Sequence, residues 1–411
     1  MRILICPDKF AGTLSARQVA EAVRDGWREV APGDELVSRP LSDGGPGFVE
    51  VLAAALPGRR VPVRTVDPLG RPVEGEILLT ADGGTAYVES AQACGLHLLA
   101  PDERDPLRTS SYGLGALLAT AAEAGARRAV VGLGGSAVND GGAGLLAALN
   151  AVPVDASGTA LPYGGAALRA VEGLVGRPQL RGMELVAATD VDNPLTGLTG
   201  ASNVFGPQKG ASREDVLLLD DALRRFAEVL ERDLPGCPSG LAGLPGAGAA
   251  GGLGAALFAL GGRCESGIDL VTRLTGLDAA YDEADLVITG EGSFDHQSLR
   301  GKVVAGVAGA ARDRGVPCVV LAGRVSAGRR ESAAAGVTEA YSLVEHFGGE
   351  PHGGVERAME RPAEGLRPWP PGWPASGVDD EGLPGRSGAF VTFVTPDRTI
   401  RHAGTGSTRP G

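Results

Sequence analysis

Two short stretches near the start of the sequence combine charged side chains with glycines. Asp8 and Lys9 follow the apolar run at residues 3–6, and Asp43 stands beside two glycines within residues 42–45. Glycine lets a backbone approach a ligand closely, and a lysine can hold a phosphate or a carboxylate. Each stretch by itself is equally typical of a solvated loop or a turn. Neither stretch alone indicates a binding site. They become candidate ligand contacts because further stretches of the same kind follow in the sequence.

The glycine-rich stretch at residues 132–144 reads GLGGSAVNDGGAG. Its first six residues match the G-x-G-x-x-A dinucleotide pattern, with Asp155 about 20 residues further on. The match is unspecific, because the chain contains 65 glycines. The pair Asn139-Asp140 before the apolar run 143–149 is more informative, since loop amides and a helix dipole can hold an anion there. No G-K-[ST] follows, which excludes a P-loop. A tight strand–helix turn is the structural alternative. Gly134, Gly135 and Ser136 are predicted to donate hydrogen bonds to an anionic oxygen, and Asn139 and Asp140 are further predicted contacts to substrate or nucleotide.

Carboxylates also follow a later apolar run, in the sequence TDVDN at residues 189–193. Asp190 and Asp192 are two positions apart, a spacing that suits Mg²⁺, or a cation together with a general base. A helix cap and a turn would need the same residue types. Lys209, in the segment FGPQKG, could reach a phosphate.

A fourth polar stretch, TGEGSFDHQSLRGK, occupies residues 289–302. Glu291, Asp295 and Lys302 share it with His296. A lone histidine is more often structural. The combination of acid, hydroxyl, glycine and lysine nevertheless favours a polar site over an ordinary loop.

The surrounding elements follow a strand–loop–helix pattern. Residues 2–6 read as a strand, and Ser15 opens a helix with Gln18 three positions on, which is a capping-box pattern. The pattern returns as a strand at 284–288, a loop at 289–301 and a helix from about residue 303. Further strands are expected at residues 85–89, 129–133, 184–188 and 318–322. Parallel strands of this kind bring the polar residues that follow them to one edge of a sheet, where ligands bind.

These elements predict an α/β protein with more than one core, because 411 residues exceed the usual size of one core. Residues 1–65 and 281–360 are expected to form a discontinuous Rossmann-like domain with a doubly wound parallel sheet. Residues 66–280 would be an inserted mixed α/β domain. Residues 361–411 are rich in proline and glycine, which predicts a mostly irregular tail with one strand-like run at 389–394.

Composition narrows the class of protein. The net charge of −12 disfavours nucleic acid and membrane surfaces as partners. The five cysteines are scattered without a C-x-x-C pair, which indicates free thiols in a reducing compartment. The apolar run at the N-terminus is too short for a signal peptide or a membrane span. A cytoplasmic location is therefore expected.

Seven motifs in order resemble the type-I glycerate kinase family, the bacterial glycerate 2-kinases, over about residues 1–360. They are PDKFAGTLSA (7–16), LSDGGPG (41–47), GLGGSAVNDGGAG (132–144), ATDVDNPLTG (188–197), FGPQKGA (205–211), GAGAAGGLGAAL (246–257) and ADLVITGEGSFDHQSLRGK (284–302). The resemblance implies ATP- and Mg²⁺-dependent phosphorylation of D-glycerate, usually at the 2-hydroxyl. It also implies two α/β domains with the active site in the cleft between them, with glycerate and the nucleotide as the expected ligands.

Roles within the candidate set follow from what phosphoryl transfer needs, which is positioning and charge neutralisation. Asp190 is expected to act as the base or to orient the metal, with Asp43 or Asp192 holding Mg²⁺. Lys9, Lys209 and Lys302 are the candidate cations. The remaining contacts to substrate or nucleotide are expected at Asp8, Gly134, Gly135, Ser136, Asn139, Asp140, Asn193, Gly290, Glu291, Ser293 and Asp295. Two alternatives stay open: an NAD-dependent oxidoreductase that uses residues 132–137 and Asp155, and a glycerate-binding regulator without turnover.

Overall fold

The computed structural model of the chain describes residues 1–299 and 303–367, which belong to one compact unit. Lys302 and the strand-like run expected at 389–394 lie outside the described residues. The predictions for them therefore stay predictions.

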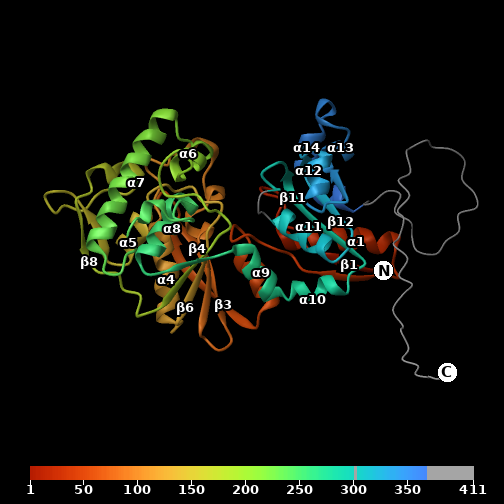
Figure 1. Ribbon diagram of the computed structural model, residues 1–411, viewed down its shortest axis with the longest axis horizontal. Helices are drawn as coiled ribbons and strands as arrows, with labels where there is room; N and C mark the ends of the chain where they lie inside the picture. Colours follow the sequence, from red (N-terminus) through yellow and green to blue (C-terminus); the bar gives the residue numbers. More distant parts are fainter. Residues whose placement is uncertain (300–302, 368–411) are drawn as a thin grey trace, which may run out of the picture. The chain divides into compact units, whose positions relative to one another are not determined.

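The first sheet has five strands, all parallel, in the order β13-β12-β11-β1-β2. Its members come from both ends of the described chain, and Figure 1 shows β1, β11 and β12 side by side. This sheet is the predicted doubly wound parallel sheet. The strands are β1 (Arg2–Ile5), β2 (Glu35–Ser38), β11 (Leu286–Phe294), β12 (Cys318–Val325) and β13 (Glu339–Ser342).

Helices cover both faces of the first sheet because its strands are apolar on both sides. Ile3 and Ile5 pack with α1 (Ala16–Val30), whereas Leu4 shares a cluster with α11 (Val303–Asp313). Strands buried on both faces read as continuous apolar runs, which is what the sequence shows. The predicted capping box at the start of α1 is confirmed, with Ser15 as N-cap and Gln18 at N3.

The second sheet is mixed, in the order β10-β9-β6-β5-β4-β3. Strands β10, β9, β6 and β5 are parallel, and β4 and β3 complete the sheet as antiparallel strands. One of its faces packs into a large apolar cluster with α4, α5, α7 and α8. The strands are β3 (Gly58–Val66), β4 (Pro72–Thr80), β5 (Thr85–Glu89), β6 (Arg128–Gly132), β9 (Glu184–Ala188) and β10 (Arg263–Glu265).

The other elements connect or cover these sheets. A small antiparallel pair consists of β7 (Ala151–Val154) and β8 (Gly173–Gly176). The helices are α2 (Phe48–Ala55), α3 (Ala91–Cys94), α4 (Tyr112–Glu123), α5 (Ala143–Ala148), α6 (Ala201–Phe205), α7 (Arg213–Asp233), α8 (Ala249–Ala259), α9 (Gly267–Thr275), α10 (Leu277–Asp282), α12 (Arg329–Ala334), α13 (Leu343–His346), α14 (Gly354–Glu360) and α15 (Pro362–Leu366). The 3-10 turns are Leu96–Leu98, Pro101–Glu103, Gly165–Ala170, Pro207–Lys209, Leu241–Gly243 and Glu350–His352.

The prediction of a loop at residues 289–301 is wrong for residues 289–294, because β11 continues to Phe294. Thr-Gly-Glu-Gly-Ser reads locally as a turn. These residues nevertheless form a strand because they pair with β12: Gly290 pairs with Leu321 and Glu291 with Ala322. Gly290 is needed here because a side chain would lie 2.1 Å from the Leu321 carbonyl oxygen.

Residues 361–367, expected to begin an irregular tail, are also ordered. Pro362 occupies the first turn of α15, where its fixed φ favours a helix. Leu366 is buried in the same apolar cluster as Trp27 of α1. The predicted domain boundary at residue 65 falls inside β3. The division into two domains itself stays a prediction.

Candidate active site

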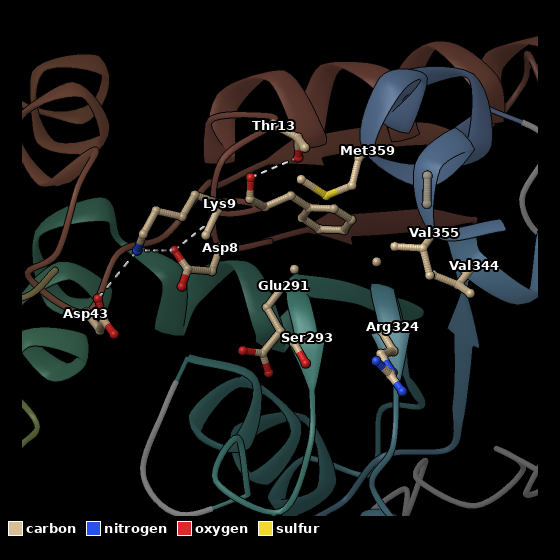
Figure 2. Close-up of a pocket in the computed structure, with 15 residues that line it drawn as sticks. Asp8, Lys9, Thr13, Asp43, Glu291, Ser293, Arg324, Val344, Val355 and Met359 are labelled. Carbon is tan, nitrogen blue, oxygen red and sulfur yellow. Dashed lines mark hydrogen bonds and ion pairs between the residues drawn. The ribbon is translucent and has the colours of Figure 1, made fainter. Parts of the chain in front are cut away.

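A pocket of about 440 Å³ lies at the carboxyl ends of the strands of the first sheet. Asp8 and Lys9 reach it from the loop after β1, and Asp43 from the loop after β2. Glu291 and Ser293 line it from β11 (Figure 2). Five of the side chains predicted from sequence therefore converge in one pocket, as the strand-end argument requires.

Lys9 lies between two carboxylates at one end of this pocket. Its Nζ is 3.4 Å from Asp8 Oδ1 and 3.8 Å from Asp43 Oδ1 (Figure 2). Burial opposes the charge on Lys9, but Asp8 and Asp43 outweigh burial and raise its pKa. Lys9 is therefore a cation at neutral pH, fixed in place by its two neighbours.

Asp8 is the buried member of this group. Burial raises its pKa to about 6, although the neighbouring Lys9 opposes the shift. Its Oδ1 also accepts a hydrogen bond of 2.7 Å from the Lys9 backbone amide. A carboxylate with such a pKa can exchange protons close to neutral pH.

The loop that carries Asp43 is held by Glu89 at the end of β5. Glu89 Oε2 accepts hydrogen bonds from the amides of Gly47 and Val49, at 3.1 and 3.3 Å. Burial raises the pKa of Glu89, and the two amide donors oppose that shift. Glu89 was not predicted, although a carboxylate at the last position of an apolar strand was a visible signal.

Two glycine-rich loops meet beside Lys9. A side chain at Gly134 would lie 2.7 Å from the Gly45 Cα, and one at Gly45 would lie 3.3 Å from Lys9 Nζ. Gly135 adopts a φ of 65° and packs on the ring of Pro46. The loop after β6 therefore comes close to Lys9 only because these positions have no side chain.

Asp190, in the loop after β9, lies next to this group and contacts the start of α9, and it is not among the residues that line the pocket. Its Oδ1 accepts a hydrogen bond of 2.7 Å from the Ser266 hydroxyl, and Oδ2 accepts one of 3.1 Å from the Ile268 amide. Burial raises its pKa to about 6, with these two donors opposing. A side chain at Gly267 would lie 2.4 Å from the Asp43 carbonyl oxygen and 3.3 Å from Asp190 Oδ2. Asp190 therefore caps a helix and also adjoins the Asp43 loop.

Three predicted ligand contacts lie instead in a buried network. Asp140 accepts hydrogen bonds from the Ser111 amide and hydroxyl, both at 2.8 Å, and from two glycine amides. Lys209 Nζ donates to the Val138 carbonyl at 2.6 Å, and Asn139 Nδ2 donates to Ser202 Oγ at 2.9 Å. The amides of Ser111, Gly142 and Gly144 thus bind the Asp140 carboxylate, which is part of the protein, in place of a bound anion. Burial lowers the pKa of Lys209 to about 7.

Other candidates serve local structure. Asp295 Oδ1 accepts the Gln297 and Ser298 amides in a turn, and Asn193 Nδ2 donates to the Thr199 carbonyl. Asp192 is exposed and Ser136 is buried. Neither is among the residues that line the pocket.

The pocket also contains residues that were not predicted. Arg324 lines it from β12, and its guanidinium lies 2.5 Å from Glu350. The rule that polar residues after a strand are site candidates would have selected Arg324, had it been applied to the strand expected at 318–322. Phe10, Val355 and Met359 line the pocket as well, and no pattern in the sequence singled them out.

The side chains that could bind a metal ion are few around this pocket. Within residues 1–299 and 303–367, no group of three or more His, Cys, Asp or Glu side chains is arranged to hold a metal ion. Mg²⁺ in kinases commonly takes one or two carboxylates plus substrate phosphates and water. Asp43, which faces the pocket, fits such a role better than the exposed Asp192.

The dinucleotide alternative does not fit the geometry around residues 132–137. Helix α5 begins only at Ala143, so no helix directly follows the glycine pattern. Asp155 accepts hydrogen bonds from the Ser157 and Thr159 amides in a turn after β7. The glycine pattern therefore lacks the helix that a dinucleotide site requires, and Asp155 serves to close a turn.

The cysteines and the helices of the structure bear on two further predictions. All five cysteines are free, as expected. In the part of the chain that the structure describes, none of the helices combines the length and apolar character needed to cross a membrane.

Comparison with known proteins gives a consistent result. The model of the glycerate kinase family matches residues 3–368. Glycerate 2-kinase of Escherichia coli K12 is 43% identical over 332 residues, which cover 79% of this chain and 86% of that protein. Glycerate kinase of Bacillus subtilis 168 is 42% identical over 370 residues, covering 89% and 94%. A crystal structure from Salmonella typhimurium LT2, assigned as glycerate kinase 2, has a TM-score of 0.71 at 40% identity and covers 90% of this chain and 96% of that one.

Proposed function

Because the chain belongs to the glycerate kinase family and is thus a phosphotransferase, we propose that it transfers the γ-phosphoryl group of ATP to the 2-hydroxyl of D-glycerate. The product would be 2-phosphoglycerate. The observation that carries the proposal is the position of Lys9, a cation held by Asp8 and Asp43 at the edge of the pocket. Phosphoryl transfer needs such a fixed positive charge next to the phosphates.

Lys9 and the carboxylates around it would have different roles in phosphoryl transfer. Lys9 would hold an oxygen of the transferred phosphoryl group and offset the charge that develops on it. Asp190 would accept the proton of the glycerate hydroxyl, because a carboxylate with a pKa of about 6 is charged at neutral pH and still basic. Asp8 is the second carboxylate with a pKa of about 6, and its place beside Lys9 suits orientation of that lysine.

Mg²⁺ fits the same site as a further part of the proposal. Asp43 would hold it together with the nucleotide phosphates, and the metal would supply charge neutralisation and orientation of those phosphates. Gly45 and Gly134 let the two glycine-rich loops pack closely beside Lys9, so that their backbones would lie near the anionic oxygens that Lys9 holds. A cytoplasmic location, where ATP and glycerate are both available, completes the proposal.

A coupled assay with ATP, Mg²⁺ and D-glycerate tests the function directly. We expect ADP release that depends on glycerate, and NMR should identify the product as 2-phosphoglycerate. 3-Phosphoglycerate as product would change the proposed acceptor hydroxyl only. Glycerate binding without ADP release would favour a regulator, and hydride transfer from a hydroxy acid to NAD would overturn the proposal.

A further inference from the structure

The pocket that contains Lys9 has a second, apolar end. Val344, Val355, Ala358 and Met359 line it from α13 and α14, and Phe10 lines it from the turn after β1. In Figure 2, Lys9 and Asp43 lie at one end, and Val344, Val355 and Met359 lie at the other. The pocket therefore changes from charged to apolar along its length.

Two of these apolar side chains are exposed. Val355 has 39% of its surface exposed and Met359 has 54%, and both are large hydrophobic residues on α14. They are four positions apart, so they project from the same side of the helix. An exposed apolar pair inside a pocket indicates a ligand that covers it.

A tight turn lies beside Met359. Phe10 and Leu14 exchange backbone hydrogen bonds at 2.9 and 3.0 Å, which closes the turn, and Thr13 Oγ1 donates to the Phe10 carbonyl. A side chain at Gly12, where φ is 80°, would lie 4.0 Å from Met359 Cε. The Met359 methyl group thus lies close to this turn, which holds one side of the Met359 side chain in place.

We infer that the apolar end binds the nucleobase of the phosphoryl donor, against the exposed side chains of Val355 and Met359 on α14. This inference rests on the proposed use of ATP. Glycerate is a three-carbon acid with two hydroxyls, so it has no apolar surface for Val355 and Met359 to contact. A nucleobase has two apolar faces, and its phosphates would extend toward Lys9. A volume of about 440 Å³ is within the range of pockets that bind small molecules.

Oxidation of Met359 in the intact protein tests the contact without mutation. The chain has three methionines, of which Met1 is 39% exposed and Met183 is buried. Peroxide oxidation would be followed for each methionine by mass spectrometry, with and without saturating ADP. We expect ADP to slow the oxidation of Met359 about fivefold or more, because a bound base covers the thioether. Met1 should oxidise at the same rate in both samples. Equal Met359 rates with and without ADP would overturn the inference.

Substitutions provide a second measurement, by calorimetric binding of ADP. Met359→Gln keeps the length of the side chain and removes its apolar character, and Val355→Ala removes two methyl groups. Each should raise the Kd for ADP about threefold to tenfold, whereas Met359→Leu should bind ADP like the wild type. Leu217→Ala, an exposed apolar position on α7, is the matched control. Unchanged ADP affinity in both Met359→Gln and Val355→Ala would contradict the inference.

These readouts separate the inference from the proposed function. If ADP protects Met359 but the protein does not phosphorylate glycerate, the base site stands and the proposed acceptor is wrong. If glycerate is phosphorylated while Met359 stays unprotected, the base site alone is wrong.

Discussion

Lys9 Nζ lies 3.8 Å from Asp43 Oδ1, although the two residues belong to loops that follow different strands. Strands β1 and β2 are parallel neighbours, with Ile5 opposite Ser38. Their carboxyl ends therefore deliver the lysine and the aspartate to the same place. The ion pair is a consequence of parallel pairing, and the proposed phosphate site depends on it.

Lys9→Met should reduce kcat/KM by about 10²–10³, since a charge that stabilises the transition state is removed. The thermal midpoint should also fall, because the variant leaves the buried Asp8 carboxylate without its neighbouring cation. Lys9 also lowers the pKa of Asp8, so the variant should show a higher Asp8 pKa by NMR titration. Arg17→Met removes an exposed cation on α1 and is the control. Near-normal turnover by Lys9→Met would mean that another cation holds the phosphate.

Asp190→Asn should lower kcat by about 10² or more if this carboxylate is the general base. The control is Ser266→Ala, which removes the hydrogen bond to Asp190 and leaves the carboxylate in place. Both variants should lose about 1 kcal/mol of stability, because both weaken the cap of α9. Equal losses of activity in the two variants would identify Asp190 as a capping residue only.

The pH dependence of kcat/KM should show an acidic limb near pH 6. Burial raises the pKa of Asp190 to about 6, so the base becomes protonated and inactive below that pH. Ser266 donates a hydrogen bond that opposes this shift, and Ser266→Ala should move the limb to higher pH. Rates measured between pH 5 and 8 at saturating ATP would check both statements. A flat profile through pH 6 is incompatible with Asp190 as the base.

Lys209 should make the free energy of unfolding rise with pH above neutrality. Its folded pKa is lowered to about 7, whereas an unfolded lysine titrates near 10.4. Between these values the unfolded state binds more protons, so the folded state gains stability as the pH rises. The gain between pH 7 and pH 9 should be on the order of 1–2 kcal/mol larger than in Lys209→Met, as measured by urea denaturation.

Arg213→Met removes an exposed charge from α7 and should keep the pH dependence of the wild type. If Lys209→Met also keeps it, Lys209 retains its charge in the folded protein above pH 7.

The central parallel strands were predictable from local sequence, whereas β2, β3, β4, β7, β8, β10 and β13 were not predicted. The expected strands at residues 85–89 and 184–188 match β5 and β9, and the Ser15 capping box is confirmed. Buried parallel strands are continuous apolar runs, and a helix cap is a local pattern of two side chains. Neither feature needs distant residues to be recognised. The same local reasoning failed at Gly290, where pairing with β12 continues a strand that the glycines had suggested was over.

The residues of the site were likewise predictable only in part. The sequence by itself determined that Asp8, Lys9 and Glu291 are candidates, because each follows the end of an apolar run, and that Asp43 is one, because it stands beside two glycines. Only the tertiary structure decided that these residues share a pocket and that Asp140 and Lys209 belong to a buried network. It also brought Met359 of α14 close to the turn at Gly12. The physical reason is range: an apolar run depends on neighbouring residues, whereas a contact between distant loops depends on how the sheet orders its strands.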